Sequence, residues 1–187
     1  MNEVITTIKS RRSVRAYKRD IITKDVVDAI IEAGIFAPTG HNQQAWHFTV
    51  IQDREVIGGI NQKCKKLMAD VKVDWIKNIA ENPKHDITYN APVLVIISAM
   101  RSALTGKTDS AAAMQNMMLA AESMNIGSCW MGLVNFIFGS EDETAKLGIP
   151  DEYEPQHAAV FGYKADDTKK DGPPRNRDVV NYIGTFK

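Results

Sequence analysis

The segment 91–100, APVLVIISAM, is the longest apolar run in the chain and carries no charged side chain. It has about half of the roughly 20 residues that a membrane-spanning helix needs. An uninterrupted run of this length, rich in β-branched residues, is typical of a strand that is buried on both faces. We therefore expect residues 92–99 to form a central strand, and we expect no association with a membrane.

Helical and strand patterns alternate along the rest of the chain. Apolar residues at helical spacing predict helices that include residues 4–8, 26–31, 53–80, 109–125 and 141–147. Aromatic, β-branched and apolar composition predicts strands or buried segments at residues 46–51, 128–134 and 157–163. Strands separated by helices indicate an α+β fold of three layers, in one domain spanning residues 1–187.

Local signals mark some of the boundaries. Thr23 is a suitable N-cap for the helix over 26–31. Pro38 disfavours helix in the residue before it, so we expect a loop over 37–45. We expect Gly127 to end the helix over 109–125.

Composition excludes several classes of partner. The chain has 23 basic and 23 acidic residues, so it has no general attraction for nucleic acid. Its first residues lack the basic start and apolar centre of a secretory signal, and we expect a cytoplasmic protein. Cys64 and Cys129 form no CxxC pair and are expected to be free thiols, while the four histidines show no metal-ligand spacing. No metal is expected.

Basic residues gather near both ends of this neutral chain. Five of them lie within residues 9–18, and Arg175 and Arg177 lie near the other end. Cations after a helix also stabilise its C-terminal end, by typically 0.3–1 kcal/mol, so the first cluster alone is equally compatible with a solvated surface. The second cluster favours a phosphate site, because several guanidinium groups from separate segments match a phosphate dianion well.

Two further segments are candidates for a ligand site. Residues 38–46, PTGHNQQAW, combine an exposed loop backbone with side-chain amides that suit the polar edge of a heteroaromatic ring. Residues 127–132, GSCWMG, have a glycine at each end, which permits close approach of the backbone to a ligand. Taken alone, residues 38–46 are more typical of an ordinary turn than of a ligand site, and residues 127–132 are equally compatible with a plain turn.

In this order, the segments resemble the flavin-contacting signatures of the nitroreductase family. Arg11-Arg-Ser-Val-Arg15 is similar to the family's RRSxR element, and residues 38–46 are similar to its PSxxNxQPW loop. Residues 109–129 resemble its long central helix with the Gly-Ser turn that follows, and Phe161-Gly-Tyr163 resembles the strand that ends before a basic tail. Ala45 stands where the family usually has proline, and Gly40 where serine is common, which leaves the subfamily open.

The resemblance implies a three-layer α-β-α fold, with a central mixed or antiparallel sheet, in a domain-exchanged homodimer. It implies FMN as cofactor, and the absence of a GxGxxG motif agrees with a mononucleotide. By position, the phosphate and ribityl end is assigned to Arg11, Arg12, Ser13, Arg175 and Arg177, and the pyrimidine edge to Arg15. The partner subunit is expected to contribute Pro38, Thr39, Gly40 and Asn42. The ring is expected to face Cys129, Trp130, Met131 and Gly132, with the backbone N–H groups of the last two near N5.

The implied activity is an NAD(P)H-dependent oxidoreductase. NADH or NADPH reduces FMN at N5 and leaves, and a small acceptor such as a nitroaromatic, quinone or enone then takes the reducing equivalents in a ping-pong cycle. No side-chain nucleophile is required, and Arg15 supplies electrostatic support only. Two alternatives stay open: a protein that stores or senses flavin without turnover, and an α+β interaction module that binds no flavin.

Overall fold

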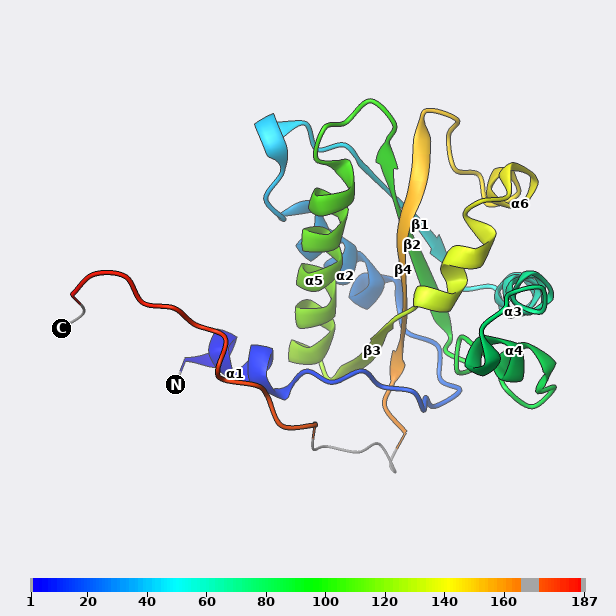
Figure 1. Cartoon of the computed structure of the whole chain (residues 1–187), viewed down its shortest axis with the longest axis horizontal. Coiled ribbons are helices and arrows are strands. Elements are labelled where there is room, and N and C mark those ends of the chain that lie inside the picture. Colours follow the sequence, from blue (N-terminus) through cyan, green and yellow to red (C-terminus); the bar gives the residue numbers. More distant parts are fainter. Residues whose placement is uncertain (1, 166–171, 186–187) are drawn as a thin grey trace.

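The computed structural model describes residues 2–165 and 172–185, which are arranged around one sheet (Figure 1). The sheet has the order β1-β2-β4-β3, and every neighbouring pair is antiparallel. Its strands are β1 (Trp46–Ile51), β2 (Val93–Met100), β3 (Ile126–Trp130) and β4 (Tyr153–Tyr163). The predicted central strand is confirmed, because β2 pairs with β1 on one side and with β4 on the other.

Alternate side chains of β2 enter two separate hydrophobic cores. Val93, Val95 and Ile97 pack with α2 (Lys24–Ile35) and α5 (Gly106–Ser123), whereas Leu94 and Ile96 pack with α3 (Arg54–Met68). Figure 1 shows α2 and α5 on one face of the sheet and α3 on the opposite face. The face that carries α3 also carries α4 (Asp74–Glu81), η2 (Gly132–Ile137) and α6 (Glu141–Ala145). The predicted three-layer α+β fold is therefore confirmed.

Strand β4 begins four residues before the predicted strand at His157. The sequence hides this part of the strand, because Pro155 and polar neighbours interrupt the apolar pattern. Pro155 pairs with Ser98 next to a register shift between Ile97 and Ser98. A bulge is one of the few places where a sheet accepts proline, which has no N–H to donate.

The Ala/Met-rich helix α5 is buried against the sheet, with Met114, Met117 and Ala121 fully inaccessible to solvent. It ends at Ser123, so the expectation that Gly127 terminates it was wrong. Asn125 makes the left-handed turn, with a φ of 57°, and Gly127 lies within β3. A Cβ atom on Gly127 would lie 2.9 Å from Val14 Cγ1, so glycine is needed here for close packing.

The two ends of the chain extend from the same side of the body (Figure 1). Helix α1 (Glu3–Ser10) buries none of its residues, and residues 173–185 are exposed. Large apolar side chains are nevertheless frequent there, including Val4, Val179, Tyr182 and Ile183. In the part of the chain that is described, we find no helix with the length and apolarity that crossing a bilayer requires.

Candidate functional site: the arginine segment and the loop over residues 38–42

The N-terminal arginines lie on an extended segment that is attached to the edge of the sheet. Ser13 and Ser128 form a parallel bridge, and Val14 N–H donates to the Ser128 carbonyl at 2.9 Å. Tyr17 bridges to Lys164 just after β4. Val14 is buried against Gly127, while Ser13 stays exposed. The segment is therefore held by its backbone, which leaves the arginine side chains available.

Arg11 and Arg12 present buried nitrogen atoms without acceptors. Arg11 Nη1 and Arg12 Nε are inaccessible to solvent and have no hydrogen-bond partner among the described residues. Arg12 Nη1 does have partners, the carbonyls of Lys9 at 2.6 Å and Arg11 at 2.9 Å. A buried donor left unpaired costs about 1–3 kcal/mol, and more when the group is charged. These nitrogen atoms therefore indicate a missing acceptor, and their chemistry fits a phosphate group.

The C-terminal tail passes beside Arg12 at Gly172. A Cβ atom on Gly172 would lie 2.5 Å from Arg12 Nε. Arg175 and Arg177 are exposed, and no carboxylate of the described residues pairs with either one. The structure thus brings Gly172 to the N-terminal arginines and leaves the two arginines of the tail in solvent.

Arg15 occupies a different environment from Arg11 and Arg12. Its Cζ atom lies 6.0 Å from the centroid of the Tyr89 ring, and Cys129 and Tyr17 lie nearby. Burial raises the pKa of Cys129, although positive charge on Arg15 opposes that rise, and burial raises the pKa of Tyr17 as well. Both groups are therefore neutral at pH 7. Arg15 has neutral neighbours and, among the described residues, no carboxylate within ion-pair distance.

Sequence reasoning missed Tyr89. It lies in a tight turn before β2, where Tyr89 and Asn90 have φ values of 57° and 54°. Asp86 Oδ1 accepts from Thr88 N–H at 2.7 Å and from its hydroxyl at 2.6 Å, and Ile87 N–H donates to Asn61 at 3.0 Å. The turn is fixed by these bonds. Two successive non-glycine residues of positive φ are visible only in the structure, so no sequence signal pointed to this turn.

The loop over residues 38–42 is tied to the first turn of α5. Asp109 Oδ2 accepts hydrogen bonds from the Thr39 hydroxyl at 2.9 Å and from Gly40 N–H at 3.1 Å. Pro38 and Asn42 are exposed. Residue 109 was expected only as the start of a helix, because nothing in its local sequence shows that it contacts a residue seventy positions away.

The segment after β3 departs in one respect from what we predicted. Met131 N–H donates to the Ala158 carbonyl at 2.8 Å, so it is engaged within the chain and is not free to face a flavin ring. The pairing of β3 with β4 continues one residue beyond the strand and occupies this donor. Gly132 is exposed, and a Cβ atom there would meet nothing within 4 Å. Cys129 is buried, and Trp130 is partly exposed with its ring 4.9 Å from that of His157.

The structure places the two groups of predicted residues at opposite ends of α5 (Figure 1). The loop over 38–42 is bound at Asp109 near the start of the helix, and the arginine segment is bound to β3 beyond its end. At 1.5 Å per residue, the part of the helix between Asp109 and Ser123 is roughly 20 Å long. One chain therefore does not bring these groups together.

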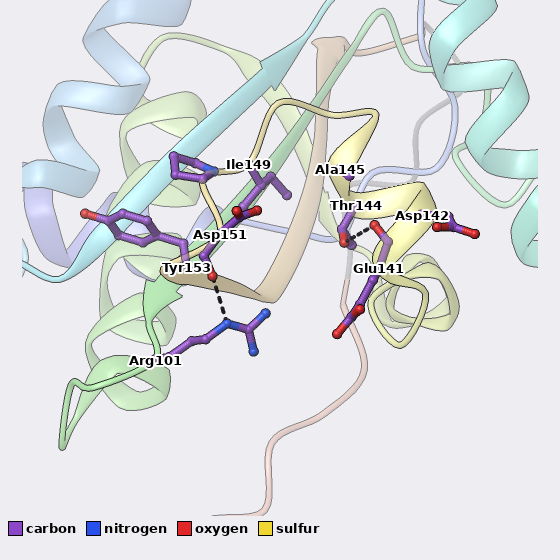
Figure 2. A pocket seen from close by; sticks show the side chains of 9 residues that line it. Arg101, Glu141, Asp142, Thr144, Ala145, Ile149, Asp151 and Tyr153 are labelled. Atoms are coloured by element: carbon purple, nitrogen blue, oxygen red, sulfur yellow. Dashed lines mark hydrogen bonds between the residues drawn. The ribbon is translucent and has the colours of Figure 1, made fainter.

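A pocket on another side of the molecule has different chemistry (Figure 2). It has a volume of about 480 Å³ and lies between α6 and the turn before β4. Its charged lining is mainly acidic: Glu141, Asp142 and Asp151, with Arg101. Arg101 is already engaged with the Asp151 carbonyl at 3.0 Å and with Glu154 at 3.7 Å. No predicted site residue lines this pocket, and its charge does not suit a phosphate.

Comparison with known proteins identifies the family. Residues 8–163 match the model of the nitroreductase family, so the chain belongs to that family. A nitroreductase from Bacteroides fragilis, solved with bound FMN, is 32% identical with a TM-score of 0.91, covering 98% of this chain and 100% of that one. A nitroreductase from Desulfitobacterium hafniense, also with bound FMN, is 26% identical with a TM-score of 0.87, covering 98% and 100%. The FMN reductase [NAD(P)H] of Bacillus subtilis is 29% identical, over 100% of this chain and 75% of that protein.

Proposed function

We propose that this chain is an FMN-dependent oxidoreductase that uses NADH or NADPH to reduce small molecules. The observation that carries the proposal is the pair of buried, unpartnered nitrogen atoms on Arg11 and Arg12. An anion is the ligand that both would accept. A terminal phosphate supplies that anion, and relatives of similar length and fold bind FMN.

The remaining residues are assigned by the same logic. Arg11, Arg12 and Ser13 would hold the phosphate and ribityl end, and Arg175 and Arg177 would join them from the tail, which passes Arg12 at Gly172. Arg15, among neutral neighbours, would face the pyrimidine edge of the ring and favour the anionic reduced form over the neutral oxidised one. Gly132 would supply the backbone donor that we had assigned jointly to Met131.

We infer that the functional unit is a homodimer. The loop over 38–42 and the arginine segment of its own chain lie at opposite ends of a helical stretch roughly 20 Å long, so the loop would contact the FMN of a second chain. Exposed apolar side chains on the outlying segments, among them Phe36, Leu104 and Tyr182, would be covered in such a dimer. Each site would then take its phosphate clamp from one subunit and its loop from the other.

Bound FMN supplies the redox chemistry, because it accepts a hydride at N5 and passes electrons to an acceptor by a ping-pong cycle. The chain itself binds the phosphate, holds a fixed positive charge at Arg15 and shields the ring from water. None of these tasks needs a nucleophile. The acceptor class would be a nitroaromatic, a quinone or an enone.

One experiment on the purified protein tests the proposal. The protein is first reconstituted with an equal excess of FMN and FAD, and unbound flavin is removed. Heat denaturation of one portion should release FMN, identified by chromatography. A second, native portion should consume NADH or NADPH in the presence of a quinone or a nitroaromatic compound. Release of FAD or of no flavin would overturn the cofactor assignment. Tight FMN without any NAD(P)H consumption would support flavin storage or sensing instead.

A further inference from the structure

Asp109 is a buried carboxylate whose described partners all approach one oxygen. Its residue is 6% exposed, and Oδ2 accepts from the Thr39 hydroxyl, from Gly40 N–H and from the Thr105 hydroxyl at 2.9, 3.1 and 3.0 Å. Hydrogen bonds to an ionised acceptor are the strong ones. Two of the three donors belong to the loop over 38–42, so the carboxylate ties that loop to α5.

The tie continues into the rest of the loop. The Thr39 hydroxyl, which donates to Asp109, also accepts from Gln44 N–H at 3.0 Å. The Gln44 side-chain amide in turn donates to Asn42 Oδ1 at 3.0 Å. One carboxylate therefore organises the loop from Thr39 to Gln44 through a continuous set of hydrogen bonds.

The loop needs such an anchor because its backbone is unfavourable. His41, Asn42 and Gln44 have φ values of 54°, 53° and 46°, in the left-handed region that favours glycine. Residues persist there only where their surroundings over-determine the conformation. The Thr39 hydroxyl and Gly40 N–H both donate to this carboxylate, so we expect the loop to relax to other conformations when it is removed.

We propose that Asp109 is a positioning residue for the flavin site of the partner subunit. It holds the loop over 38–42 in the conformation that contacts FMN across the dimer, and it touches no flavin itself. The inference rests on the proposed function, because only a dimeric FMN site gives the loop something to contact.

The first test measures flavin affinity of the dimer by quenching of flavin fluorescence. Asp109→Ala should raise the Kd for FMN roughly tenfold or more, and Asp109→Asn, which keeps one acceptor oxygen, should raise it less. If the side-chain amides of the loop contact the polar edge of the ring, binding of riboflavin should weaken by the same factor as binding of FMN. The matched control is Ser110→Ala, at the residue next to Asp109. It removes a buried hydroxyl that has no hydrogen-bond partner among the described residues. Its Kd should equal that of the wild type.

The second test distinguishes action on the partner's site from action within the chain. A heterodimer is made from one Asp109→Ala subunit and one Arg12→Ala subunit, purified through two different affinity tags. If the loop acts across the interface, one site combines the intact arginine segment of the Asp109→Ala subunit with the intact loop of the Arg12→Ala subunit. The heterodimer then holds one FMN per dimer with wild-type affinity. The other site combines the altered arginine segment with the altered loop and stays empty. If the loop acts within its own chain, both sites are impaired and no tight FMN remains.

Each result decides a different statement. Wild-type affinity in folded Asp109→Ala, with folding checked by thermal unfolding, would overturn the role of Asp109 and leave the FMN assignment intact. A heterodimer without a tight site would overturn the action across the interface. Should Asp109→Ala fail to fold, Thr39→Val tests the same link from the loop side, and an unchanged Kd there overturns the proposal. Failure of the wild type to bind FMN would instead overturn the proposed function.

Discussion

The guanidinium carbon of Arg15 lies 6.0 Å from the centre of the Tyr89 ring, although the two residues are far apart in the sequence. A cation over an aromatic face is attracted by about 0.5–1 kcal/mol at an exposed site, and this contact restricts where the guanidinium can lie. Tyr89 itself lies in a hydrogen-bonded turn, in which its own N–H donates to the Asp86 carbonyl and Ala91 N–H donates to the Thr88 carbonyl, both at 3.1 Å. The position of the Arg15 charge thus depends on a residue that carries no charge.

This relationship predicts an effect on the reduction potential of the bound flavin. Arg15→Ala should lower the potential by some tens of millivolts, because about 30 mV corresponds to 1.4 kcal/mol for a two-electron couple. Tyr89→Leu should lower it by a smaller amount, and Tyr89→Phe, which keeps the aromatic face, should change it least. The measurement is a dye-equilibrated redox titration at matched FMN occupancy. Equal potentials in Arg15→Ala and the wild type would contradict the assignment of Arg15 to the ring.

Arg12 should act on the phosphate rather than on the ring. Arg12→Ala should raise the Kd for FMN roughly 10-fold to 100-fold, because it removes a charge-assisted hydrogen bond worth about 1.5–3 kcal/mol. The Kd for riboflavin, which has no phosphate, should change little. Arg19→Ala is the matched control, since Arg19 is an exposed cation of the same segment. Fluorescence titration with the two flavins gives both constants. A parallel loss of FMN and riboflavin would mean that Arg12 does not contact phosphate.

Packing at Gly127 should be measurable by a double-mutant cycle. Gly127→Ala places a Cβ atom 2.9 Å from Val14 Cγ1, which should lower the free energy of unfolding by about 1–3 kcal/mol and weaken FMN by moving the arginine segment. Val14→Ala in the same chain should recover part of both losses. Gly58→Ala, where no atom lies within 4 Å, should stabilise α3 by up to about 1 kcal/mol. Additive effects of Gly127→Ala and Val14→Ala in urea unfolding would rule out this contact as the cause.

Burial of Cys64 gives the stability a dependence on alkaline pH. Burial raises the pKa of its thiol to about 12, whereas an exposed thiol ionises near a pKa of roughly 8.5. The folded state therefore holds the thiol proton more tightly than the unfolded state does. The contribution of the thiol to the free energy of unfolding is complete below the pKa of the unfolded state. It is lost as the pH rises toward the pKa of the folded state. The slope is about 1.4 kcal/mol per pH unit.

Urea unfolding of the wild type and of Cys64→Ala between about pH 8 and pH 10.5 measures this contribution. The wild type should lose more of its free energy of unfolding over this range than the variant, which lacks the thiol. Cys129→Ala provides a second comparison, because burial raises its pKa too. Identical pH slopes in the wild type and Cys64→Ala would show that the thiol does not contribute.

The sequence predicted those features that depend on local pattern. The apolar run identified β2, and helical spacing identified α5, because burial on one or both faces leaves a direct trace in composition. The basic clusters at both ends of the chain also predicted an anion site, and that assignment stays a prediction. In contrast, Asp109 and Tyr89 act through residues distant in the chain, and no local pattern records such contacts. Met131 was misassigned because the pairing that occupies its N–H depends on the register of β3 with β4.

The order of the strands also constrains how the chain is made. β4 is the last of the described strands in the sequence, yet it lies between β2 and β3 in the sheet. Until residues 153–163 have left the ribosome, β2 can therefore pair only with β1, and β3 lacks the one described strand with which it pairs. Unpaired strand edges are prone to aggregation at this stage. A nascent chain of this protein is consequently exposed to misassembly until nearly all of its sheet-forming sequence is available.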